Sequence, residues 1–404
     1  MMTNHITYYQ ICSAVRRKGA LALCLALCML GLALSATAQE PAIITINPPG
    51  AGTGAWQGTQ AIAINPVGAI TGFYSDSKNV YHGFLRTPDG KFTTFDAPGA
   101  GSETVPGFYA TAIGVLGGQG TYGISINYAG AISGAYIDKE NVMHGFLRDP
   151  DGNFTTIDDP YAGTGYAQGT EAGNINPAGT IAGTYVDGSG LNHGYVRSPD
   201  GTFTTIDATG AGTSSGQGTI VEWASSLNPA GAITGNYYDG SGVSHGYVRA
   251  PDGTITEFDV PGAGKEAGQG TWSWSINPAG AVTAMYVDKD NVVHGYVRAD
   301  DGAITPFDVP GAGTGPGQGT IGEGINPAGQ IAGNYLDASG VNHGYVRAAN
   351  GTITKFDVPG AGSGSGQGAI PLTNILGGKI TGAYIDNGNV IHGFLRPPTP
   401  PWIW

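Results

Sequence analysis

The stretch Gln318–Gly362 reads QGTIGEGINPAGQIAGNYLDASGVNHGYVRAANGTITKFDVPGAG, and it decides the fold. It contains four short runs rich in β-branched and aromatic residues, separated by Asn-Pro-Ala-Gly, Asp-Ala-Ser-Gly and Ala-Asn-Gly. These separators hold the Gly, Pro, Asn and Asp residues that reverse the backbone between antiparallel strands. The stretch shows no helical period of useful length. We therefore predict four antiparallel strands in about fifty residues, the size of one β-propeller blade.

The same frame recurs along the chain. Its marker, His-Gly followed by Phe or Tyr, begins at seven histidines: His82, His144, His193, His245, His294, His343 and His392. Their successive spacings are 62, 49, 52, 49, 49 and 49 residues. In the first full copy we expect strands at Gln60–Asn65, Ala69–Ser75, Val80–Arg86 and Lys91–Asp96. The sequence thus predicts an all-β fold over residues 39–396, a seven-bladed β-propeller of four-stranded antiparallel blades.

The two ends of the repeat region complement each other. The last copy stops at Arg396 without a fourth strand, while Ile43–Asn47 resembles a fourth strand that has no blade of its own. A closed ring leaves no strand edge open to other chains. We therefore predict that this N-terminal strand completes the last blade, antiparallel to Val390–Arg396, with Asn47 facing His392.

The repeated polar residues are expected to be structural, because a catalytic constellation occurs once whereas these occur in every blade. Hairpin register places Tyr74, His82 and Asp96 on one face of the first blade, since strand side chains alternate. Such a row would tie three strands together. The acidic stretch Asp149–Asn153 is similarly expected to be a hairpin tip and not a calcium loop. We expect no metal site and no cofactor.

Residues 1–38 are typical of a secretory signal peptide. A basic segment at Arg16–Lys18 precedes the apolar run Ala20–Leu34, and Ala36-Thr37-Ala38 resembles a cleavage site. The expected location is therefore secreted or periplasmic, and 397–404 is read as a Pro-rich tail. All three cysteines precede the cleavage site, so we expect no disulfide in the mature chain.

Charge argues against nucleic acid as a partner. After the predicted cleavage, 14 basic and 30 acidic residues give a net charge of −16, which would repel a polyanion. No second apolar stretch approaches membrane-spanning length. We expect the mature chain to be a monomer without a membrane span.

The repeated frame resembles the HAF-repeat, or probable extracellular repeat, family. That repeat centres on a His-Ala-Phe-type strand preceded by an Asn-x-x-Gly turn and a hydrophobic-Gly strand. The resemblance covers Pro41–Arg396, although Gly follows each histidine here and Arg stands where an aromatic residue is common. It implies an extracellular location and supplies no catalytic residues.

Function is best sought where the copies differ, which is just after Gln-Gly-Thr or Gln-Gly-Ala in the predicted inner strand. The fourth copy also carries three extra residues there. In propellers these positions line the central channel. The candidate ligand-binding residues are Tyr122, Glu171, Glu222, Trp223, Trp272, Trp274 and Glu323.

These residue types suit a sugar, because aromatic faces stack on pyranose C–H groups and carboxylates accept hydroxyl hydrogen bonds. The alternative is that the tryptophans pack between blades and the glutamates are solvated. We predict a recognition module that binds a carbohydrate or protein on one face. Two other interpretations are a polysaccharide hydrolase or lyase that uses channel carboxylates, and a cell-surface structural protein. The segment 102–118 is an insertion that could cover the channel or contact a partner.

Overall fold

The computed structural model describes residues 42–104, 118–223, 225–374 and 377–398. The predicted signal peptide, most of the 102–118 insertion and most of the 397–404 tail lie outside these residues. One compact unit spans Ile43–Pro398. It is a single 29-stranded sheet without helices among the described residues, which confirms the all-β class. The described part of the chain accordingly has no helix able to cross a membrane.

The first four-stranded set matches its predicted strands within two residues. It consists of β2 (Gly58–Ile64), β3 (Ile70–Ser75), β4 (Tyr81–Arg86) and β5 (Phe92–Phe95), each antiparallel to the next. The order recurs in β6 (Gly120–Ile126), β7 (Ile132–Ile137), β8 (Met143–Arg148) and β9 (Phe154–Ile157), and in β10 (Gly169–Ile175), β11 (Ile181–Val186), β12 (Asn192–Arg197) and β13 (Phe203–Ile206).

The remaining sets follow the same order with a shorter or broken inner strand in two of them. They are β14 (Gly218–Ile220), β15 (Ile233–Tyr238), β16 (Ser244–Arg249) and β17 (Ile255–Phe258); β18 (Gly270–Thr271) with β19 (Ser275–Ile276), β20 (Val282–Val287), β21 (Val293–Arg298) and β22 (Ile304–Phe307); β23 (Gly319–Ile325), β24 (Ile331–Leu336), β25 (Asn342–Arg347) and β26 (Ile353–Phe356); and β27 (Gly368–Asn374), β28 (Ile380–Ile385) and β29 (Ile391–Arg396).

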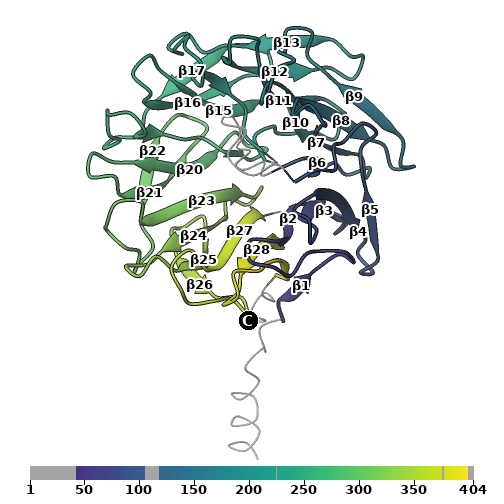
Figure 1. The fold of residues 1–404 in the computed structure, drawn as a ribbon. Helices are drawn as coiled ribbons and strands as arrows, with labels where there is room; N and C mark the ends of the chain where they lie inside the picture. Colours follow the sequence, from purple (N-terminus) through teal and green to yellow (C-terminus); the bar gives the residue numbers. More distant parts are fainter. Residues whose placement is uncertain (1–41, 105–117, 224, 375–376, 399–404) are drawn as a thin grey trace, which may run out of the picture. The chain divides into compact units, whose positions relative to one another are not determined.

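Neighbouring sets are joined at the start of each inner strand. Gly58 of β2 pairs in parallel with Ile391 of β29, as Gly120 of β6 pairs with Tyr81 of β4. A Cβ on Gly58 would lie 1.9 Å from the carbonyl oxygen of Ile391, and the φ of Gly58 is +122°. Only glycine fits such a junction, which explains the repeated Gln-Gly. Because β29 returns to β2, the sheet closes on itself (Figure 1).

The predicted N-terminal closing strand is confirmed. β1 (Ile44–Ile46) pairs antiparallel with β29, with Ile46 opposite Gly393. The side chain of Ile46 is fully buried among residues of the first set, including Phe84. Asn47 Nδ2 and His392 Nδ1 are 3.0 Å apart, as the register predicted.

The predicted Tyr–His–Asp row is also confirmed. The ring of Tyr74 stacks on His82 at 5.1 Å between centroids, and His82 Nδ1 lies 2.8 Å from Asp96 Oδ1. A second carboxylate, Asp76 of the β3–β4 hairpin, lies 3.8 Å from the other ring nitrogen and was not predicted. The hydrogen bond to Asp96 raises the pKa of His82.

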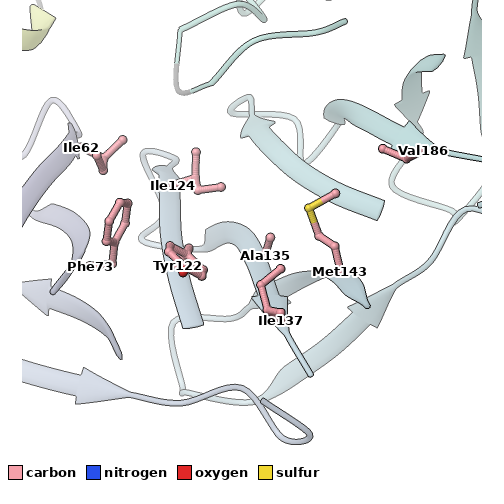
Figure 2. Packing of buried hydrophobic residues seen from close by; sticks show 8 residues of the cluster. All are labelled: Ile62, Phe73, Tyr122, Ile124, Ala135, Ile137, Met143 and Val186. Atoms are coloured by element: carbon pink, nitrogen blue, oxygen red, sulfur yellow. The ribbon is translucent and has the colours of Figure 1, made fainter. Parts of the chain in front are cut away.

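Adjacent sets pack through apolar clusters. Figure 2 shows one, where Phe73 of β3 meets Tyr122 of β6 edge to face at 4.9 Å. The repeated arginines serve the same junctions, since the guanidinium of Arg148 lies 5.0 Å from the ring centre of Phe95 in the preceding set. This contact supports the structural interpretation of the repeated arginines.

Candidate functional site

The inner strands lose regular pairing at the residues where the copies differ in sequence. The register of β10 on β11 shifts between Glu171 and Asn174, and that of β23 on β24 shifts between Gly322 and Gly324, on either side of Glu323. Similar shifts occur in β2, β6 and β27, while Trp272–Trp274 separates β18 from β19. Such bulges redirect side chains out of the regular alternation. The inner strands can therefore place unusual residues in the same region.

The three extra residues of the fourth copy fall in an irregular segment, residues 221–226, of which 224 is not described. This 221–226 segment follows β14 and is held by residues of neighbouring sets. Asn174 Nδ2 of β10 donates to the carbonyl oxygen of Glu222 at 2.6 Å and to Ser226 Oγ at 2.8 Å. On the other side, the amide of Ile276 donates to the carbonyl oxygen of Ser225 at 2.9 Å. The backbone that carries Glu222 and Trp223 is therefore fixed by side chains and strands outside its own set.

Trp223 extends from this segment to the inner strands of the first two sets. Its ring lies 6.4 Å from that of Phe73, nearly perpendicular, and it packs against the cluster that contains Tyr122. The indole Nε1 is buried without an acceptor in hydrogen-bonding geometry. It faces the carboxyl group of Glu171.

Glu171 is the most unusual residue of this region. Its side chain is 0% exposed, and neither carboxyl oxygen has a hydrogen-bond partner of acceptable geometry. Burial raises its pKa well above the ordinary value, and the nearby charge of Glu222 raises it further. A buried carboxyl group without a hydrogen-bond partner lowers the stability of the fold, because no protein group replaces the water that it lost on burial.

Two half-buried carboxyl groups accompany it. Burial raises the pKa of Glu222 to about 7. Burial and the charge of Glu222 raise the pKa of Glu323 to about 8. Glu222, in the 221–226 segment, thus lies within electrostatic range of both Glu171 in β10 and Glu323 in β23. None of the ion pairs among the described residues includes them.

The predicted aromatic residues occupy different environments. Tyr122 is fully buried, stacks on Tyr81 at 4.8 Å, and its hydroxyl donates to the carbonyl oxygen of Gly118 at 2.7 Å. It is therefore a core residue with no exposed face. Trp272 and Trp274 are half-buried and pack against the apolar cluster of the fifth set. Their packing matches the structural alternative raised by the sequence, while their exposed parts leave room for contact with a ligand.

Tyr238, at the end of β15, was missed by the sequence analysis. It is half-buried, its hydroxyl interacts with Trp272, and the charge of Glu222 reaches it. A detectable signal existed, since the equivalent positions hold Ser75, Ile137, Val186, Val287, Leu336 and Ile385. Two residues earlier on the same strand face, Asn236 is fully buried with both amide atoms unpartnered. Tyr238 therefore links Trp272 to Glu222.

A groove lies beside one of the histidine rows. This groove, of about 450 Å³, is lined by Asp239, Ser241, His245, Asp259 and Lys265, among others. Within the described residues, no group of three or more His, Cys, Asp or Glu side chains could hold a metal ion.

Known structures share this architecture. Virginiamycin B lyase from Staphylococcus aureus is 14% identical, with a TM-score of 0.54 over 88% of this chain and 98% of that one. The BP39L lectin from Burkholderia pseudomallei is 10% identical, with a TM-score of 0.49 over 80% and 91%. Both are β-propeller proteins, and the first likeness shows that this chain has a β-propeller fold. No family model and no curated protein matches the sequence.

Proposed function

We propose that this chain is an exported, seven-bladed propeller of the HAF-repeat type. We propose further that it recognises a carbohydrate at the carboxyl cluster, which consists of Glu171, Glu222 and Glu323. The blade number is supported by the recurrence of one strand order from β2 to β29, with β1 as the last outer strand. Export is supported by the three-part pattern of residues 1–38. Family membership is supported by the repeated His-Gly strand and the Asn-x-x-Gly turn.

The observation that carries the binding function is that Glu222 lies within electrostatic range of both Glu171 and Glu323, and that none of the three is in an ion pair among the described residues. Folding alone does not favour this arrangement, because buried polar groups in native proteins are ordinarily hydrogen-bonded. A polyhydroxylated ligand would supply the missing bonds. Carboxyl groups that titrate near neutral pH can donate to some hydroxyls and accept from others. Trp272 and Tyr238 offer partly exposed aromatic surface beside them.

A polysaccharide hydrolase or lyase is the second candidate. With a pKa of about 8, Glu323 is protonated at neutral pH, as a general acid must be. Glu222, with a pKa of about 7, is ionised in about half of the molecules at neutral pH and can then act as a base or nucleophile. Cleavage of a bound glycan would favour this activity over recognition alone.

The test begins with the mature protein on a glycan array, followed by a reducing-end assay on each glycan that binds. Glu222→Gln should abolish binding without loss of folding, because it keeps the shape of the side chain. Glu140→Gln is the matched control, since Glu140 is 60% exposed and pairs only with Lys139. If no glycan binds, or if both variants bind like the parent, the carboxyl cluster is not a carbohydrate site. A chain without any ligand would instead fit the structural role considered above.

A further inference from the structure

We propose that the ligand of the carboxyl cluster carries a positive charge, and that it is an oligosaccharide of amino sugars with free amines. This inference rests on the proposed carbohydrate-binding function and names its substrate class. It follows from the charged and aromatic side chains described around Glu222 and Glu323, and from the buried carboxyl group of Glu171.

The first argument is the lack of a countercharge. The arginines of the repeat frame bond to turn carbonyls or stack on phenylalanines at the blade junctions, as Arg298 does on Phe258 at 5.0 Å. The lysines in described ion pairs bond to exposed hairpin carboxylates, as Lys289 does to Asp290. Neither type of cation is paired with Glu222 or Glu323. An ammonium group on the ligand would therefore meet two carboxylates that have no competing partner, the arrangement in which a charge-assisted hydrogen bond is strongest.

The second argument is that two buried groups near this pair are also unpartnered. The carboxyl group of Glu171 is fully buried and turned toward Glu222 and the indole N–H of Trp223. The N–H itself has no acceptor in good geometry. The hydrogen bonds of Asn174 hold in place the 221–226 segment that carries Glu222 and Trp223. Acidic groups with unfilled hydrogen-bonding capacity are complementary to a donor-rich cation.

The third argument concerns the rest of the ligand. Tyr238, which the charge of Glu222 reaches, and Trp272, which interacts with the hydroxyl of Tyr238, are both half-buried and present aromatic surface and a hydroxyl. Aromatic faces accept both sugar C–H groups and ammonium groups. An amino sugar combines the two, whereas a neutral sugar offers no cation to the carboxyl groups and a simple amine leaves the aromatic surface unused.

A cationic ligand has a second consequence, which is proton release. In the free protein the pKa values of Glu222 and Glu323 are about 7 and 8, so both are mostly protonated at about pH 6. An ammonium group favours the ionised forms, so binding expels protons. Burial also raises the pKa values of the other titratable groups whose charges interact with these two carboxyls: Glu171, Tyr238, Tyr247 and Tyr345.

The experiment is isothermal titration calorimetry of the mature protein at about pH 6, in two buffers of different ionisation enthalpy. The probes are a short chitosan oligosaccharide and its fully N-acetylated counterpart of equal length, which lacks the positive charge. We expect the chitosan to bind with release of roughly one to two protons, and the acetylated sugar to bind at least about tenfold more weakly. Glu222→Gln and Glu323→Gln should each weaken chitosan binding by about tenfold or more. Glu140→Gln should leave it unchanged, and circular dichroism checks that each variant is folded.

Several results would overturn the inference. Equal binding of the acetylated sugar would refute the positive charge and leave the carbohydrate site standing. Chitosan binding without proton release, or binding that survives both glutamine variants, would place the ligand away from these carboxyl groups. Failure of both probes to bind, with a neutral glycan binding on the array, would refute the amino-sugar class but not the proposed function.

Discussion

The substitution Ile46→Ala tests whether the N-terminal strand closes the ring. Ile46 is 0% exposed in β1 and packs with Phe84 and Tyr74 of the first set. Truncating a buried isoleucine costs about 2–4 kcal/mol, from lost transfer energy and the cavity left behind. In a chain of this length each kcal/mol lowers Tm by about 1–2 °C, so we expect a fall of roughly 2–8 °C by calorimetry.

Ile206→Ala supplies the matched control. Ile206 occupies the same place in β13, is 1% exposed, and lies opposite Gly194 as Ile46 lies opposite Gly393. Its loss should reduce the free energy of unfolding by a similar amount, because the packing is equivalent.

The two variants should differ in local opening. Weakening β1 frees one edge of β29, so hydrogen exchange at Ile391–Arg396 should accelerate in Ile46→Ala but not in Ile206→Ala. If Ile46→Ala melts like the parent while Ile206→Ala is destabilised, β1 contributes nothing to closure in solution and our argument fails.

Three further predictions concern charge. The pKa of Glu323 is about 8 in the folded chain and about 4.5 in the unfolded chain, so between these values only the folded chain keeps the proton and its stability falls as pH rises. Glu323→Gln should flatten this fall and raise the free energy of unfolding at neutral pH by about 1 kcal/mol, after allowance for the partial exposure of the side chain. Chemical denaturation at a series of pH values measures the slope, and a steeper slope in the variant would contradict the prediction. Because the pKa of His82 is raised on folding, its contribution to stability is complete below the pKa of the unfolded chain and is lost as pH rises through the pKa of the folded chain. His82→Gln should therefore lower Tm in mildly acidic buffer and have a smaller effect at alkaline pH. Equal effects on Tm at both pH values would rule out a charged row. Asn47→Asp gives the Tyr–His row of the last set the carboxylate that the other sets have, and it should stabilise the chain by less than about 1 kcal/mol, since the equivalent Asp96 is 58% exposed. A lower Tm of this variant in mildly acidic buffer would show that the contact with His392 does not tolerate a charge.

The architecture could be predicted closely from the sequence because each blade repeats the same local rules. The turns contain residues that reverse the backbone, and strand alternation alone aligns Tyr74 with His82 and Asp96. The N-terminal strand was predictable for the same reason, since Ile43–Asn47 keeps the frame that the last copy lacks. The second carboxylate of the row, Asp76, was not predicted because it lies in a hairpin whose side-chain direction does not follow from alternation.

The candidate site was predictable in composition but not in arrangement. Sequence differences between copies identified Glu171, Glu222 and Glu323, and in the structure Glu222 lies within electrostatic range of the other two. The position of Trp223 depends on an irregular segment fixed by Asn174, 48 residues away from Glu222, and no periodicity describes such a contact. Tyr122 was selected because it differs from the other copies, yet it fills the core between two blades.

The pairing of β1 with β29 also bears on how the protein matures. A chain is synthesised from its N-terminus, so β1 emerges first and its partner emerges last; Asn47 and His392 are 345 positions apart. Until the final blade exists, β1 has no native neighbour and the first and last sheets keep bare edges that favour aggregation. A polypeptide cut short by premature termination therefore cannot reach the sealed state, however well its earlier blades have folded. Closure acts as a test of completeness, which separates finished molecules from fragments open to proteolysis.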